Sequence, residues 1–176
     1  MILVTGATGF IGRVLVRQLT ETGHEVRVLL RPSPKSPRLP KGVPVEVAVV
    51  SLNDESGVRA ALRGVDEVYH LASAAALGRQ GNLFTTDIEG TRILAQTAAA
   101  AEIKRLIFLS HIGADRASAF PVHKAKGIAE EHIRKSGVPY TIIRSSIVFG
   151  PEDGFTTALS ELMRLLPGLV PIPGNS

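Results

Sequence analysis

The chain contains 176 residues, carries a formal net charge of +4 at pH 7 and has no cysteine. This length is enough for the core of one domain, and the lack of cysteine excludes disulfides, thiolate metal sites and cysteine nucleophiles within these residues. The basic residues are scattered and only 5% of the residues are aromatic, so the composition argues against nucleic acid as the main partner.

The apolar runs of the sequence are strand-sized and interrupted by charged residues, which argues against a membrane span. The N-terminus lacks a basic region followed by a cleavage site, so no signal peptide is predicted. We therefore expect a cytoplasmic protein.

The first twelve residues predict a buried strand, a glycine turn and the start of a helix. Gly6 suits the positive φ of a tight turn, Gly9 lets the backbone approach phosphate oxygens, and Gly12 lets helix and strand pack closely. The unpaired N–H groups and the positive dipole end of the helix favour an anion. The pattern predicts a site for a dinucleotide diphosphate; the alternative is a structural turn that binds no ligand.

The rest of the chain alternates between helices and strands. The first helix is indicated by apolar residues at helical spacing, Ile11, Val14, Leu15 and Leu19, and Gly23 ends it. Five prolines make residues 32–44 a loop. Further helices are predicted at 53–62, about 86–101 and about 121–135, and further strands at 25–30, 45–50, 67–72, 105–110 and 140–144.

Near-continuous apolar strands separated by helices indicate a parallel sheet that is covered on both faces. We therefore predict an α/β fold of the Rossmann type, a doubly wound parallel sheet with strand order 3-2-1-4-5-6 and helices on both faces.

Six segments in chain order resemble landmarks of the short-chain dehydrogenase/reductase superfamily, in particular its extended and atypical branches. These branches include NmrA-like proteins and NAD-dependent epimerases and dehydratases, and similar segments occur in relatives of the 39-kilodalton accessory subunit of respiratory complex I. The segments are residues 5–12, 64–72, 89–94, 109–115, 136–144 and 148–151. The resemblance implies an NAD(P)-binding Rossmann domain over 1–150, followed at 151–176 by the start of a truncated substrate-binding segment.

Arg31 bears on the choice of dinucleotide. NAD-specific folds place a carboxylate about twenty residues beyond the glycines to bind the ribose 2′-hydroxyl. Arg31 stands at the end of the second strand instead, where its guanidinium can pair with a 2′-phosphate. Lys35 and Arg38 in the following loop would strengthen that pairing. This favours NADP; in the alternative interpretation Arg31 is solvated and NAD binds through backbone contacts.

The turn, the strand ends and the resemblance together predict a set of dinucleotide-binding residues. Ser51 follows the third strand, where the family often has an aspartate near the adenine amine. The full predicted set is Gly6, Thr8, Gly9, Phe10, Ile11, Gly12, Arg31, Ser51, Leu52, Leu71, Ala72, Ser73, Ser110, Lys126, Ser146 and Ile147.

The catalytic pattern of the superfamily is incomplete in this chain. A Tyr-x-x-x-Lys motif is absent from the sequence. By resemblance the lysine falls on Lys126 and the tyrosine position on Val122. Lys126 shares a helical stripe with Val122 and Ile133, which predicts a lysine on the inner face of the helix. The resemblance implies that this lysine holds the nicotinamide ribose. The alternative is a lysine that extends to water.

Ser110 occupies the region of the serine or threonine that polarises a substrate carbonyl in the family, and Ser110 and Lys126 are the predicted catalytic residues. His111 or His123 is a candidate for a substitute proton donor; the alternative is a solvated or structural histidine. No metal site is predicted. The chain is thus expected to be an NAD(P)-dependent oxidoreductase or an epimerase/dehydratase-like enzyme acting on an unknown small molecule, and a homodimer is the expected assembly. The alternative is a non-catalytic NADP(H) sensor or complex-assembly subunit.

Overall fold

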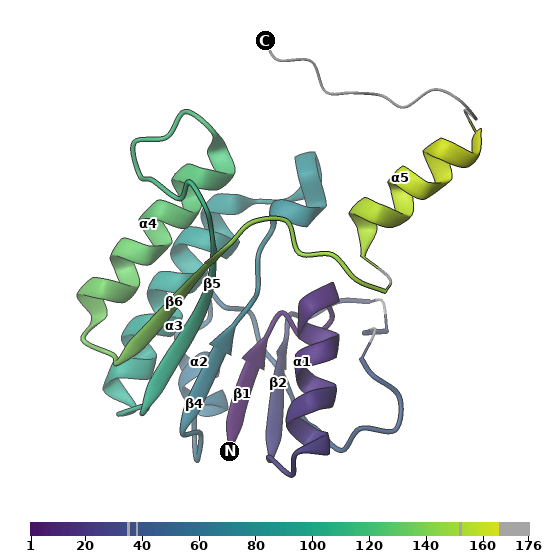
Figure 1. Ribbon diagram of the computed structural model, residues 1–176. Helices are drawn as coiled ribbons and strands as arrows, with labels where there is room; N and C mark the ends of the chain where they lie inside the picture. Colours follow the sequence, from purple (N-terminus) through teal and green to yellow (C-terminus); the bar gives the residue numbers. More distant parts are fainter. Residues whose placement is uncertain (35, 38, 152, 166–176) are drawn as a thin grey trace. The chain divides into compact units, whose positions relative to one another are not determined.

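The computed structural model describes residues 1–34, 36–37, 39–151 and 153–165. Its contacts divide the chain into two units, Met1–Ser145 and Ser146–Ser176. The first unit contains a six-stranded parallel sheet with the order β3-β2-β1-β4-β5-β6 (Figure 1). The strands are β1 (Ile2–Thr5), β2 (Val26–Leu30), β3 (Glu46–Val49), β4 (Glu67–His70), β5 (Arg105–His111) and β6 (Tyr140–Ser145). The predicted Rossmann-type fold and strand order are confirmed.

Helices connect these strands. In the first unit they are α1 (Phe10–Glu21), α2 (Glu55–Ala61), the 3₁₀ segment η1 (Ala75–Gln80), the π-helix η2 (Phe84–Glu89), α3 (Gly90–Ala100) and α4 (Pro121–Ser136). The chain leaves β1 toward β2 and later returns to pair β4 with the other side of β1. The chain segments that follow β1 and β4 thus lead away from each other, which leaves a crevice at the carboxyl ends of these central strands.

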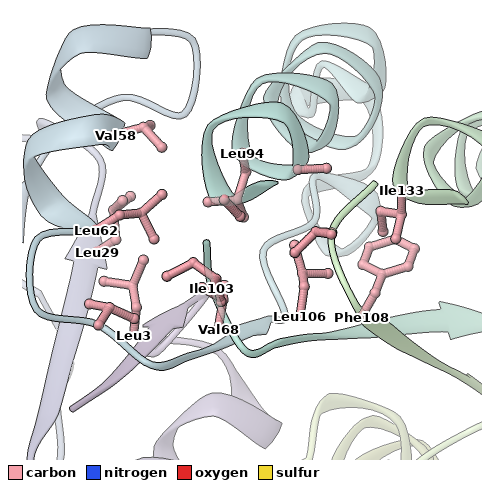
Figure 2. Packing of buried hydrophobic residues seen from close by; sticks show 14 of the residues in the cluster. Leu3, Leu29, Val58, Leu62, Val68, Leu94, Ile103, Leu106, Phe108 and Ile133 are labelled. Atoms are coloured by element: carbon pink, nitrogen blue, oxygen red, sulfur yellow. The ribbon is translucent and has the colours of Figure 1, made fainter. Parts of the chain in front are cut away.

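Two apolar clusters cover the two faces of the sheet. Leu3, Val68 and Phe108 belong to the larger cluster, where strand side chains meet Leu94 of α3 and Ile133 of α4 (Figure 2). On the opposite face the second cluster joins other strand residues to α1; its buried members are Ile2, Val4, Ala7, Val16, Leu19, Val26 and Val28. Because neighbouring residues of a strand point to opposite faces, continuous apolar strands supply both clusters.

Some local expectations differ from the structure. Val14 helped to indicate the first helix, but its side chain is 52% exposed because α1 buries the stripe of Gly12, Val16 and Leu19. The helix predicted at about 86–101 begins as η2, two residues earlier than expected, and continues as α3. Neither the length nor the apolar pattern of that segment distinguishes a π turn from an α turn.

The second unit contains α5 (Gly154–Leu165), a helix that was not predicted. At its start Asp153 accepts a hydrogen bond from the N–H of Thr156 at 2.7 Å. The structure does not describe residues 152 and 166–176, which belong to the predicted substrate-binding segment. Among the described residues, no helix combines the length and the apolar character needed to cross a membrane.

Candidate functional site

A pocket of about 320 Å³ lies at the carboxyl ends of the strands on either side of β1. This volume is in the range of small-molecule sites. Its wall consists of the glycine turn, the ends of β2 and β4, the segment after β3 and the start of η2: Thr5, Gly6, Ala7, Thr8, Gly9, Leu29, Leu30, Arg31, Val50, Ser51, Leu52, Asn53, Leu71, Ala72, Ser73, Ala74, Leu77, Thr85 and Thr86.

The turn after β1 leaves no room for a side chain at Gly6 or Gly12. Gly6 has a φ of +74°, and a Cβ placed on it would lie 2.6 Å from the carbonyl carbon of Leu71. A Cβ on Gly12 would lie 2.2 Å from the Gly6 carbonyl oxygen. The turn closes through a hydrogen bond of 3.0 Å from the Gly9 N–H to that same oxygen. The glycine spacing therefore reflects backbone packing, as the sequence predicts for these positions.

The helix α1 begins at this turn, and its N-terminus is suited to bind an anion. Gly9 is its N-cap and offers no side chain to the N–H groups of the first turn, which also holds no acidic residue. The first N–H groups of a helix have no partner within it, and the helix dipole adds positive potential there. A cradle of uncovered amides beside a pocket fits a diphosphate group.

Arg31 lines the pocket immediately after β2. Its side chain is exposed, and within the described residues it forms no ion pair. The guanidinium is therefore available to a ligand. Lys35 and Arg38, which were expected to assist it, lie outside the described residues.

Lys126 of α4 lies inside the molecule, as its helical stripe indicates. The residue is 7% exposed, and its ammonium stands 4.9 Å from the centre of the Phe108 ring. Its Nζ forms an ion pair of 3.1 Å with Oδ1 of Asp87 in η2. The expectation of a buried lysine is met, and Asp87 supplies the compensating charge that such burial requires.

Asp87 also reaches the pocket wall. Its Oδ1 accepts a hydrogen bond of 2.6 Å from the hydroxyl of Ser73, and its Oδ2 accepts one of 2.8 Å from the N–H of Ala74. Ser73 and Ala74 line the pocket. Asp87 therefore connects the pocket wall to the ammonium of Lys126. Asp87 is only 1% exposed.

Ser110, at the end of β5, faces inward. Its hydroxyl donates a hydrogen bond of 2.6 Å to Glu130 of α4, which is completely buried. Arg144 of β6 donates to both oxygens of the same carboxylate, at 2.9 and 2.7 Å, and Arg134 donates at 2.7 Å. Burial alone would raise the pKa of Glu130, but the hydrogen bonds from Arg144, Ser110 and Arg134 outweigh it and lower the pKa to about 2.

The imidazoles of His111 and His123 stack on each other at the N-terminal end of α4. Their ring centres are 4.9 Å apart, and Phe120 meets His123 edge-on at 5.6 Å. His123 lies one helical turn before Lys126 on α4. Among the described residues, no group of three or more histidines, aspartates and glutamates is placed to hold a metal ion.

The structure brings many of the predicted residues together. Nine line the pocket: Gly6, Thr8, Gly9, Arg31, Ser51, Leu52, Leu71, Ala72 and Ser73. Phe10, Ile11 and Gly12 form the first turn of α1. The described lining does not include Ser110 or Lys126. Ser146 and Ile147 belong to the second unit, so their relation to the pocket is not defined.

Sequence reasoning did not assign Asp87, Thr5 and His70 to the site. One signal in the sequence could have identified Asp87. It is a carboxylate just before the Glu-Gly-Thr segment of a largely apolar helix, and a buried lysine such as Lys126 requires a partner of opposite charge.

The crevice beside β1, the uncovered helix N-terminus and the glycine turn define a Rossmann-type domain for a nicotinamide dinucleotide. A family model described as NAD(P)H-binding matches residues 6–159. The chain belongs to this family, and its relatives and structural neighbours include members of the short-chain dehydrogenase/reductase and NAD-dependent epimerase/dehydratase group.

Three comparisons illustrate the range of similar proteins. Ceramide reductase from Caulobacter vibrioides is 30% identical over 96% of this chain and 53% of its own length. Photosystem II assembly factor Ycf39 from Cyanophora paradoxa is 30% identical over 81% of this chain and 44% of its own length. The structure of UDP-glucose 4-epimerase from Thermus thermophilus with NAD is 26% identical, with a TM-score of 0.70, over 86% of this chain and 56% of that one. The chain thus spans about half the length of these proteins.

Proposed function

We propose that this domain binds NADP(H) in preference to NAD(H) and serves a nicotinamide-dependent oxidoreductase or epimerase/dehydratase-like enzyme. The observation that carries the proposal is the pocket formed by the glycine turn, the uncapped N-terminus of α1 and Arg31. The glycine turn would hold the diphosphate, and Arg31 would pair with the 2′-phosphate of NADP. Ser51 and Leu52 would lie beside the adenosine half.

A bound nicotinamide would supply a hydride donor or acceptor. Lys126 would hold its ribose by hydrogen bonds from the ammonium, whose orientation is supported by Asp87. Ser110 could donate a hydrogen bond to a substrate carbonyl only after its hydroxyl gives up the hydrogen bond to Glu130, so we assign Ser110 a supporting role. Val122 offers no proton, which leaves the proton to the substrate, to water or to His123.

The alternative function is a non-catalytic NADP(H) sensor or a subunit that supports assembly of a larger complex. The specific observation in its favour is the absence of a Tyr-x-x-x-Lys motif from the sequence. The names of the relatives support both functions, since one is a reductase and another an assembly factor.

Two measurements on purified protein separate the functions. A titration that follows NADPH fluorescence reports binding, and absorbance at the nicotinamide band reports oxidation in the presence of quinones, flavins, azo dyes or carbonyl compounds. Binding with oxidation supports the enzyme. Binding without oxidation by any acceptor supports the sensor, and no binding contradicts both.

The preference for NADP is tested by Arg31→Ala. Loss of a charge-assisted pair with the 2′-phosphate should weaken NADPH binding about tenfold, whereas NADH binding should change less than about twofold. Arg17→Ala is the matched control, because Arg17 is an exposed arginine of α1 outside the pocket lining. Equal effects of Arg31→Ala on both dinucleotides would contradict the assignment.

A cytoplasmic location and a homodimer complete the proposal. The location is supported by the lack of cysteine in the sequence. Cell fractionation and light scattering test these two statements.

A further inference from the structure

Three consecutive residues of the pocket wall are held by side chains from other elements. The N–H of Ala72 donates to Thr5 Oγ1 at 3.3 Å. The Ser73 hydroxyl and the Ala74 N–H both donate to Asp87, at 2.6 and 2.8 Å. The shape of this wall therefore depends on where Thr5 and Asp87 stand.

His70 connects Thr5 to the helical segment that carries Asp87. It is completely buried at the end of β4, with its ring stacked on Phe108 at 5.4 Å between centres. Its Nδ1 lies 2.7 Å from Thr5 Oγ1, and its Nε2 lies 2.8 Å from Thr91 Oγ1. Thr91 lies one helical turn beyond Asp87, so His70 bridges β1 to the segment that carries this carboxylate.

The His70 ring is neutral at physiological pH. Burial, with a smaller contribution from the charge of Lys126, lowers the pKa of His70 to about 3. A neutral imidazole has one donor and one acceptor nitrogen, and a threonine hydroxyl can complement either of them. Both nitrogens are therefore satisfied, and His70 is a fixed spacer in the core with no direct part in proton transfer.

The wall formed by Ala72–Ala74 lies on one side of the glycine turn, and Arg31 lies on the other. Along the strand order, β2 carries Arg31, β1 leads to the turn and β4 leads to the wall. A dinucleotide with its diphosphate at the turn and its 2′-phosphate at Arg31 would direct its nicotinamide half toward the wall. A wall already in position lowers the ordering cost of binding that half.

We propose that His70 is a positioning residue of the dinucleotide pocket, which acts through Thr5 and Thr91 to hold Ala72–Ala74 in place for the nicotinamide half of the ligand. The inference rests on the proposed function, because it requires a dinucleotide in this pocket. It assigns a role in binding to a residue that touches no ligand.

The test compares a whole dinucleotide with a fragment. His70→Phe keeps an aromatic ring against Phe108 and removes both hydrogen bonds, and Thr5→Val removes one hydroxyl at nearly constant shape. Calorimetry would measure the dissociation constants of NADPH and of 2′,5′-ADP, which lacks the nicotinamide half. Each variant should weaken NADPH about tenfold and 2′,5′-ADP less than about twofold. In the double variant the losses should not add, because both residues act on one support.

Thr97→Val provides the matched control. Thr97 is a buried α3 residue whose hydroxyl donates to the Ile93 carbonyl at 2.7 Å, outside this network. Its replacement should lower the melting temperature without changing the affinity for NADPH. If His70→Phe does not fold, Thr5→Val carries the test alone. Equal loss of both ligands, or unchanged affinities, would overturn the role of His70, whereas no NADPH binding by the unchanged protein would overturn the proposed function itself.

Discussion

Gly6 combines two constraints that a side chain would violate, a φ of +74° and a Cβ position 2.6 Å from the Leu71 carbonyl carbon. We expect Gly6→Ala to lower the free energy of unfolding by more than about 3 kcal/mol, because backbone strain and a clash with the backbone of Leu71, just after β4, add together. Gly23 has a φ of +83° and nothing within 4 Å, so Gly23→Ala should cost only about 1–2 kcal/mol. Urea unfolding measures both losses, and equal losses would argue against the close approach of Gly6 to Leu71.

His70 makes the stability of the fold depend on pH. Its pKa is lowered from 6.5 to about 3 by burial and by Lys126, so the unfolded chain takes up a proton that the folded chain excludes. Stability is therefore lost as the pH falls below the unfolded pKa, and the loss ends near the folded pKa. Between about pH 7.5 and about pH 4.5 the loss from this one group should reach about 2–3 kcal/mol.

The measurement for His70 is urea unfolding across this pH range for the unchanged protein and for His70→Asn. The difference between the two curves isolates His70 from the carboxylates that also titrate. His24→Asn, which replaces an exposed histidine, is the matched control. A His70→Asn protein that keeps the full pH dependence would show that His70 is not the group responsible.

Single residues differ in how far the sequence predicts their surroundings. The inward position of Lys126 follows from its stripe on one helix, because helical periodicity is a local property. Its partner Asp87 lies 39 positions earlier in the chain, on a π-helix, and no local period connects the two. Thr5 and His70 are likewise 65 positions apart in the chain, and only the pairing of β1 with β4 brings them together.

At the scale of elements, Glu130 joins α4 to the edge of the sheet. The buried carboxylate receives Arg144 from β6 and Ser110 from β5. Glu130→Gln should lower the free energy of unfolding by about 2–4 kcal/mol, since it leaves the arginines without their buried counter-charge. Glu131→Gln removes two surface ion pairs, with Arg116 and with Lys135, and should cost less than about 1 kcal/mol.

Urea unfolding of the two glutamine variants tests this difference between buried and surface ion pairs. A Glu130→Gln protein as stable as Glu131→Gln would show that the network around Glu130 does not hold α4 to β5 and β6.

The order and type of the main elements follow from apolar patterns and glycine or proline boundaries, and the sheet order follows from the fold class that these patterns indicate. The pattern does not resolve how a helix begins, which is why the π-helix η2 was expected as ordinary helix. The helix α5 was not predicted, and none of its residues is buried.

At the scale of the whole molecule, residues from separate strands meet only because all six strands run parallel and end at one edge. The glycine turn, Arg31 and the Ala72–Ala74 wall come from three adjacent strands and form one pocket. The composition and the element pattern predict this architecture, since alternating strands and helices have few other ways to pack. The composition and the element pattern do not predict the substrate, because the chain spans about half the length of its relatives.

A crystal structure of the protein soaked with NADPH tests the central claim most directly. We expect diphosphate oxygens within hydrogen-bonding distance of the main-chain N–H groups in the first turn of α1, and the 2′-phosphate beside Arg31. Density for the dinucleotide at another surface, or a diphosphate directed away from the glycine turn, would contradict the account.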